Sequence, residues 1–456
     1  MFCCVKKSRE IFEIIPYSSP RLAGGQKTIS KAKGDFLINN SEIPPSHKKI
    51  LGGKLFFIFS RDFFPKFCKL SVMKNKNLKT LFLDQGETLG GAERFLIDFL
   101  TSLDLIERRR IRPIVLGAKI PEYRRMLGNS AKIFDFEYPQ VRGGVFKKLL
   151  SCGRLLQAAK KIKKIIEHEN VGQVFANTPR TIFILWIAKF FFHLKARAII
   201  MIHDFTIPQF LLRKIAAKTD IIIVNSVPTR TIVRQIIPEE YFSKMRIVEN
   251  GINISALPPA EIPQKIEKIL LIGRLDPRKG QMYLLQAAKI LQDQQSDLQF
   301  FIVGSSFPQD PRTTEYEAKL KEFAKIHNLK NVYFLPEVEN PFEAIAGADM
   351  VLALSTEPET FGRIVTEGLA MGKLVLAFDQ MGPRDILKNF ARFCNLSVQP
   401  LLVEKNSAED LAKKIQFFAE NPEMVAEFTK NSRVFVEKNY PLSETKKRLM
   451  NILVGV

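Results

Sequence analysis

Cysteine and tryptophan are scarce in this sequence of 456 residues. It has 5 cysteines, of which only Cys152 and Cys394 lie beyond residue 72, and 1 tryptophan. The cysteine count is odd and no CxxC pair occurs, which argues against a disulfide framework and against a cysteine-based zinc site. We therefore expect a reducing, cytoplasmic compartment.

Long apolar runs are also missing. The longest, residues 182–194, contains Lys189, and it is shorter than the ~20 residues that a membrane-spanning helix needs. The first residues do not follow the basic, apolar, small-residue order of a secretory signal. We expect any contact with a membrane to be peripheral, at the inner face of the plasma membrane.

Positive charge is in excess and unevenly distributed. The net charge is +22, to which residues 1–72 contribute +8, residues 73–256 contribute +15 and residues 257–456 contribute −1. A basic half next to a neutral half predicts that the two halves meet different partners. An anionic membrane surface is one possible partner of the basic half. Nucleic acid is the other, but the sequence has no zinc finger, RNP motif or recognition-helix pattern, so we expect none to bind.

From residue 78 on, short and fully apolar runs alternate with amphipathic helical patterns, which predicts buried parallel strands. The runs of the first half are 78–84, 111–117, 171–177, 196–204, 219–226 and 245–249, and those of the second half are 268–273, 298–305, 331–336, 349–355, 374–379 and 401–404. Two such sets predict an α/β protein with two doubly wound, Rossmann-like domains that face each other across a cleft.

The same pattern sets the expected domain boundaries. We expect a first domain at 73–256, a proline-rich linker at 257–264, a second domain at 265–430, and a C-terminal helix within 431–456 that packs back toward the first domain.

Residues 1–72 lack the alternation. They mix basic residues with turn-forming residues and contain one aromatic cluster at 55–64. We expect a disordered leader, or translation that starts at Met73. The alternative is a basic, aromatic arm that lies on a membrane surface.

Two features of the first domain follow the ends of expected strands. Gly90 and Gly91 follow the run 78–84 and open a helical pattern. Glycines in such a turn let backbone N–H groups approach a phosphate, although a plain tight turn has the same sequence. His203 follows an apolar run, and the carboxyl end of a parallel strand directs it into the expected cleft. A histidine that only fills the core is the alternative.

The second domain carries a basic loop and a pair of carboxylates. Arg274 and Lys279 follow its first strand and precede a helix. This arrangement suits a diphosphate and stabilises the negative charge that grows on a departing nucleotide. Glu359 lies in a loop and Glu367 in the helix that follows, where both can accept hydrogen bonds from sugar hydroxyls.

In this order and at these positions, the motifs resemble the family 4 (group 1) retaining glycosyltransferases of the two-Rossmann, GT-B fold. The resemblance extends over roughly residues 78–440 and is most specific over 269–385. It implies that Arg274 and Lys279 bind the donor diphosphate. It also implies that Glu367 binds the ribose hydroxyls and that Glu359 and His203 lie near the transferred sugar. Gly90 and Gly91 would face the diphosphate. The remaining nucleotide-binding residues would be Phe361, Gly362 and Arg363.

The chain departs from the family pattern at two places. It has Gly372-Lys373-Leu374 where Gly-x-Pro is common, and Asp385 where glutamate is common. These departures leave the identity of the donor open. No Asp-x-Asp triplet is present, so we expect a reaction that uses no metal and no cofactor.

The sequence thus predicts an enzyme that moves a sugar from a nucleotide diphosphate donor to a hydroxyl of a lipid-linked or anionic glycan, with retention at the anomeric carbon. The neutral domain would bind the nucleotide sugar and the basic domain the acceptor. A nucleotide-sugar epimerase of similar build and a nucleic-acid-binding protein that uses the basic half remain as alternatives.

Overall fold

The computed structural model describes residues 2–8, 11–16, 36–39, 48–51, 54–57, 79–85, 89–117, 120–139, 145–258, 261–307 and 310–455. The chain divides into two compact units, Met1–Lys76 and Asn77–Val456.

In the first unit, the described residues form five short strands. Three of them make an antiparallel sheet in the order β2-β1-β3, and two pair as the hairpin β4-β5. Their bounds are β1 Phe2–Ser8, β2 Ile11–Pro16, β3 Phe36–Asn39, β4 Lys48–Leu51 and β5 Lys54–Phe57. The expected leader and its aromatic arm lie largely outside the described residues, so both remain predictions.

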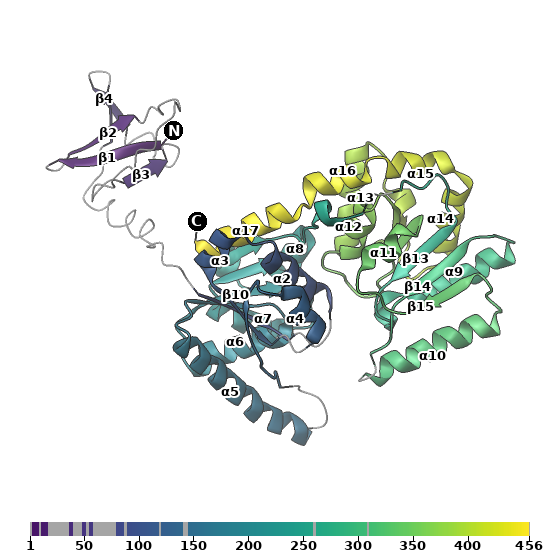
Figure 1. Ribbon diagram of the computed structural model, residues 1–456, viewed down its shortest axis with the longest axis horizontal. Helices are drawn as coiled ribbons and strands as arrows, with labels where there is room; N and C mark the ends of the chain where they lie inside the picture. The colour runs from purple at the N-terminus through teal and green to yellow at the C-terminus, as the bar shows by residue number, and fades with distance from the viewer. Residues whose placement is uncertain are drawn as a thin grey trace. The chain divides into compact units, whose positions relative to one another are not determined.

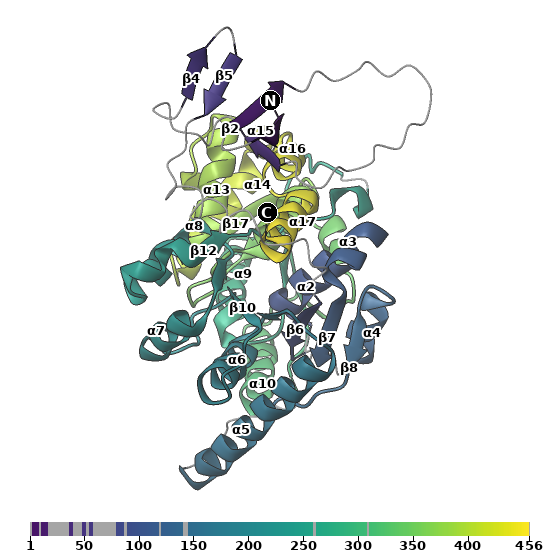
Figure 2. The ribbon, with the colours of Figure 1, turned by 90° about the vertical axis from the view of Figure 1, so that its left-hand side faces the viewer.

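The second unit contains two parallel sheets (Figures 1 and 2). The first has the order β12-β11-β10-β9-β6-β7-β8, and we call it and its helices the first lobe. Its strands are β6 Thr80–Asp84, β7 Pro113–Gly117, β8 Lys132–Phe134, β9 Gln173–Ala176, β10 Arg197–Ile202, β11 Ile221–Val224 and β12 Met245–Ile247. Six of them lie in predicted runs. Strand β8 was not predicted, because three partly exposed residues give no apolar run.

The second sheet has the order β15-β14-β13-β16-β17-β18 and forms the second lobe. Its strands are β13 Lys268–Ile272, β14 Gln299–Val303, β15 Val332–Leu335, β16 Met350–Ala353, β17 Leu374–Phe378 and β18 Leu402–Val403. Each lies in a predicted run, and the two doubly wound sheets confirm the predicted fold class. The strand order reverses between β6 and β9 in the first sheet and between β13 and β16 in the second, which are the positions where such sheets bind ligands.

Helices cover both faces of the first sheet. One face packs against α5 Val145–His168, α6 Pro179–Phe191, α7 Gln209–Lys218 and α8 Val227–Ile236. The core on the other face includes residues of α2 Gly91–Thr101, α3 Leu105–Ile111, α4 Pro121–Leu127 and α17 Leu442–Val454.

The second lobe contains the remaining described helices. They are α9 Gln281–Asp293, α10 Pro311–Ile326, α11 Pro341–Ala346, α12 Arg363–Ala370, α13 Met381–Cys394, α14 Ala408–Glu420, α15 Pro422–Thr429 and α16 Ser432–Asn439. Among the described residues, four short 3₁₀ helices lie between the longer elements: η3 Glu239–Lys244, η4 Ile254–Ala256, η5 Pro277–Lys279 and η6 Gln399–Leu401.

The end of the chain crosses from the second lobe to the first (yellow in Figure 1). We expected one helix within 431–456, whereas the structure has two, α16 and α17. Pro441 lies between them, and a proline cannot continue the preceding helix. Helix α17 is joined to the first sheet by polar contacts, since its Leu453 carbonyl accepts a hydrogen bond from Gln173 at 2.9 Å and its Ile452 carbonyl accepts one from Arg197 at 2.8 Å. Among the described helices, none has the length and apolar character needed to cross a bilayer.

A glycine brings the basic loop against the second sheet. Gly280 has a φ of +76°, and a Cβ atom there would lie 2.1 Å from the carbonyl oxygen of Leu354, the residue after β16. The loop with Arg274 and Lys279 therefore packs directly against the end of a neighbouring strand.

Substituting Gly280→Ala should lower the free energy of unfolding by more than about 2 kcal/mol, because it adds left-handed strain and forces two backbone segments apart. Urea denaturation measures this. Gly153→Ala in α5 is the matched control: nothing lies within 4 Å of its added Cβ, and alanine favours a helix over glycine. Equal denaturation midpoints for the two variants would contradict the packing described here.

Candidate functional site

Buried polar side chains lie at the switch point of the first sheet. Asp84 ends β6, and Asn177 follows β9. The Asn177 amide donates to Asp84 Oδ2 at 3.2 Å and to the Ala92 carbonyl at 2.9 Å, and the Tyr123 hydroxyl donates to Asp84 Oδ2 at 2.8 Å. The side chains of Asp84, Asn177 and Tyr123 are all buried, so they hold fixed orientations.

The cluster sets the protonation of His203. The Asn177 NH₂ group is used as a donor, so its Oδ1, 2.9 Å from His203 Nε2, accepts a hydrogen bond from the N–H of that nitrogen. Nδ1 of His203 is then an acceptor. Burial and the charge of Arg363 lower the pKa of His203 to about 3. His203 therefore stays neutral at physiological pH and can accept a hydrogen bond from a hydroxyl group.

The glycine turn lies in the same region. The backbone N–H of Gly90 donates to Glu93 Oε2 at 3.1 Å, which closes the first turn of α2. Burial and the charge of Asp84 raise the pKa of Glu93 to about 8, while the charge of Arg274 in the second lobe acts in the opposite direction. Arg274 is thus close enough to Glu93 for their charges to interact.

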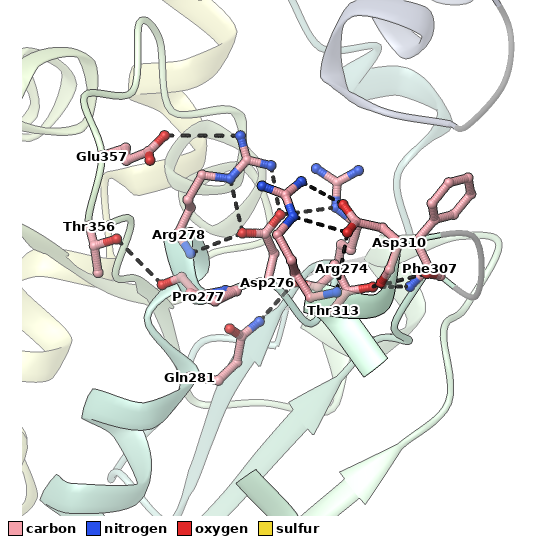
Figure 3. A network of polar contacts seen from close by, with 11 residues as sticks. Arg274, Asp276, Pro277, Arg278, Gln281, Phe307, Asp310, Thr313, Thr356 and Glu357 are labelled. Carbon is pink, nitrogen blue, oxygen red and sulfur yellow. Dashed lines mark hydrogen bonds and ion pairs between the residues drawn. The ribbon is translucent and has the colours of Figure 1, made fainter. Parts of the chain in front are cut away.

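The basic loop of the second lobe is held by Asp276 (Figure 3). One carboxylate oxygen of Asp276 accepts from the backbone N–H and Nε of Arg278, at 3.0 and 2.9 Å, and the other accepts from Nη2 at 2.6 Å. Arg274 Nε lies 3.7 Å from the same carboxylate. The side chains of Arg274 and Lys279 remain 43% and 42% exposed, so both cations are accessible to a ligand.

The loop with the first predicted carboxylate lies beside this basic loop. Lys279 Nζ is 3.8 Å from Glu359 Oε2, which also accepts a hydrogen bond of 2.5 Å from the Ser355 hydroxyl. The backbone N–H of Thr356 donates to the Arg278 carbonyl at 2.9 Å. The structure therefore brings Lys279 and Glu359 together, as the sequence predicts.

Glycines shape the start of α12 and α13. Gly362 has a φ of +99°, and a Cβ atom at Gly382 would lie 2.3 Å from the Phe361 carbonyl oxygen. The Gly382 N–H donates to the Glu359 carbonyl at 3.0 Å. Phe361 itself is buried, with its ring 5.7 Å from that of Tyr440, so it supports the loop from beneath.

Arg363 joins the two lobes. Both of its terminal nitrogens lie 3.1 Å from Asp98 Oδ2 on α2, and its Nε donates to Glu367 Oε1 at 3.1 Å. The predicted nucleotide-binding residues Arg363 and Glu367 are therefore paired with each other. Gly91 lies close to Arg363, since a Cβ atom built on Gly91 would be 3.6 Å from Arg363 Cδ. The sequence did not reveal Asp98, since an isolated acid on an amphipathic helix has no distinctive spacing.

A second connection between the lobes is formed around Thr360, and we call it the Thr360 latch. Asn225 Nδ2 donates to Thr360 Oγ1 at 2.9 Å, and Thr360 Oγ1 donates to the His203 carbonyl at 2.5 Å. The Thr360 carbonyl accepts from Ser226 at 2.6 Å and from Thr229 at 3.2 Å. The latch fixes the loop of Glu359 and Gly362 next to His203. Thr360 was not singled out in the sequence, although it lies between those two residues.

Metal ligands do not gather here. Across the side chains that the structure describes, no three His, Cys, Asp or Glu residues lie together in a way that could hold a metal ion.

Comparison with known proteins assigns the second lobe. Residues 256–435 match the family model described as glycosyl transferases group 1. The second lobe belongs to this glycosyltransferase family. The two lobes together have the GT-B fold, because Anabaena HepE in complex with UDP and glucose superposes on 83% of this chain and 100% of its own, with a TM-score of 0.68 and 21% sequence identity.

Curated relatives of this chain match over shorter stretches. An uncharacterized glycosyltransferase of Haemophilus influenzae is 25% identical over 217 residues, which are 47% of this chain and 57% of the relative. A phosphatidyl-myo-inositol mannosyltransferase of Mycobacterium leprae is 29% identical over 149 residues, 31% of this chain and 37% of the relative. The chain thus aligns with less than two thirds of the length of these relatives.

The raised pKa of Glu93 predicts a pH-dependent stability. An unfolded glutamate ionises near the ordinary value of 4.5, whereas folded Glu93 keeps its proton up to about pH 8. Between these values the folded state binds more protons, so ionisation of the unfolded state makes folding less favourable as the pH rises.

Glu93→Gln should remove this effect, because an uncharged amide can still accept from Gly90. The gain in stability of the variant over wild type should therefore grow from pH 5 to pH 8 by more than about 1 kcal/mol, measured by urea denaturation at each pH. A gain that is the same at both pH values would show that Glu93 is ionised in the folded protein.

Proposed function

We propose that this protein transfers a sugar from a nucleoside diphosphate donor to an acceptor hydroxyl. The observation that supports it is the convergence of two exposed cations, Arg274 and Lys279, with Glu359 and the neutral His203 around the switch points of the two sheets. The proposal agrees with the family of the second lobe and with the UDP and UDP-glucose bound in structures of Anabaena HepE.

In the proposed reaction, the bond between the anomeric carbon and the diphosphate breaks while the acceptor oxygen bonds to the same carbon. Arg274 and Lys279 stabilise the negative charge that develops on the diphosphate, which gives catalysis without a metal ion. Glu367 binds the ribose hydroxyls with the carboxylate oxygen that does not bond to Arg363. Nδ1 of His203 accepts a hydrogen bond from a hydroxyl of the transferred sugar.

We further propose retention at the anomeric carbon. The acceptor approaches on the face that the diphosphate leaves, and its proton passes to a phosphate oxygen of the departing group. No enzyme carboxylate is then needed as a nucleophile. Closure of the lobes, supported by exposed contacts of Arg94 and Arg125 with Glu339, limits hydrolysis of the donor by water.

The acceptor is proposed to be a lipid-linked or anionic glycan at the cytoplasmic face of the membrane. The charge of +15 carried by residues 73–256 supports an anionic partner for the first lobe. The name of the mycobacterial relative, a phosphatidyl-myo-inositol mannosyltransferase, is that of an enzyme acting on a lipid.

The donor site can be tested with the purified protein alone, before any acceptor is known. Sugars linked to UDP, GDP and ADP are screened by thermal shift, and the nucleotide that raises the melting temperature is then used in a donor hydrolysis assay. We expect Lys279→Ala to reduce the rate by about 10²–10³, because it removes a cation from the leaving group, and Glu367→Ala to weaken nucleotide binding. Lys289→Ala, an exposed lysine of α9 paired with Asp293, is the control.

Wild-type rates and nucleotide affinities in both Lys279→Ala and Glu367→Ala would refute the proposed site. Conversion of the donor to its epimer without any acceptor would favour an epimerase instead.

A further inference from the structure

The outer surface of α5, α6 and α7 differs from the rest of the first lobe. These helices lie side by side on one face of the first sheet, with α6 between the other two (Figure 2). They are joined into one layer by the core beneath them. We call their solvent-exposed side the α5–α6–α7 face.

The middle of this face is a row of aromatic rings on α6. Phe183 stacks on Trp186 at 5.7 Å, and Trp186 stacks on Phe190 at 5.4 Å. Phe191 meets Phe190 edge to face at 4.9 Å. Phe190 and Phe191 are 47% and 54% exposed, and Phe210 at the start of α7 is 66% exposed, so apolar rings reach solvent along the layer.

Basic side chains border this row on both sides. The exposed lysines of α5 include Lys160, Lys161 and Lys164, and α7 exposes Arg213, Lys214 and Lys218. Lys218 Nζ lies 6.0 Å from the Phe190 ring centre. Residues 152–218, which include these helices, hold 12 basic and three acidic side chains, so positive charge exceeds negative charge in this part of the chain.

We propose that the α5–α6–α7 face docks on an anionic lipid bilayer surface. Aromatic rings favour the boundary between lipid headgroups and acyl chains, and lysines around them attract acidic headgroups. The proposal extends the proposed function, which places the acceptor at a membrane, but vesicle binding itself requires no catalysis.

Two other partners suit this face less well. A nucleic acid would need free ring faces for base stacking, whereas Trp186, the largest ring of the row, already stacks on Phe183 and on Phe190. A second copy of the chain in a two-fold contact would bring the same basic borders against each other.

Flotation of the full-length chain with vesicles tests the proposal. The vesicles are phosphatidylcholine with or without phosphatidylglycerol. One variant, Phe190→Ser with Phe191→Ser, removes rings, and a second, Lys160→Glu with Lys164→Glu and Lys214→Glu, reverses charge. We expect wild type to float with the acidic vesicles, and each variant to partition at least about tenfold less.

Matched controls lie on the second lobe. Phe393→Ser with Phe417→Ser alters two phenylalanines that are 36% and 37% exposed, and Lys319→Glu with Lys325→Glu reverses two exposed lysines of α10. Both controls should float like wild type. A thermal shift with the nucleoside diphosphate identified for wild type shows that each variant is folded.

The docking proposal is overturned if wild type does not float, or if the face variants float as well as the controls. It is also overturned if the face variants keep vesicle binding and lose only binding to duplex DNA, or lose only self-association. Vesicle binding by a protein that binds no nucleotide would refute the proposed function and leave the docking surface intact.

Discussion

The functional site depends on a single loop that belongs to the second lobe in sequence and is bonded to the first lobe in space. The Thr360 latch joins this loop to Asn225, Ser226, Thr229 and the His203 carbonyl through buried hydrogen bonds. Each such bond contributes roughly 1 kcal/mol, but a buried partner left unpaired costs more. The loop is therefore fixed relative to both sheets, and Glu359 and Gly362 are fixed with it.

The charged groups around the loop divide into paired and accessible ones. The guanidinium group of Arg363 is paired within the protein, with Asp98 and Glu367. Arg274 stays accessible because Asp276 binds mainly to Arg278, and Lys279 stays 42% exposed beside Glu359. On the opposite side, burial keeps His203 neutral and Glu93 protonated at neutral pH, so few negative charges oppose a diphosphate there.

Much of the fold was predictable because strands buried on both sides require fully apolar runs. All but one strand of the two sheets lie where such runs occur, and the exception, β8, is too short and too exposed to produce one. Gly362 was singled out in the sequence, and it adopts a left-handed backbone conformation that other residues avoid. The same conformation at Gly280 was not predicted. By contrast, the partners of single polar residues depend on tertiary contacts. Asp98 and Thr360 therefore carry no local signal, although their contacts hold the site together.

The central claim is that loops of both lobes form one diphosphate site beneath the Thr360 latch. A crystal structure of the protein with a bound nucleoside diphosphate tests it most directly. The account predicts a phosphate within hydrogen-bonding distance of Lys279 and Arg274, with Thr360 still bonded to Asn225 and Ser226. A diphosphate bound away from both cations, or a loop detached from the first lobe while the nucleotide is held, would contradict it.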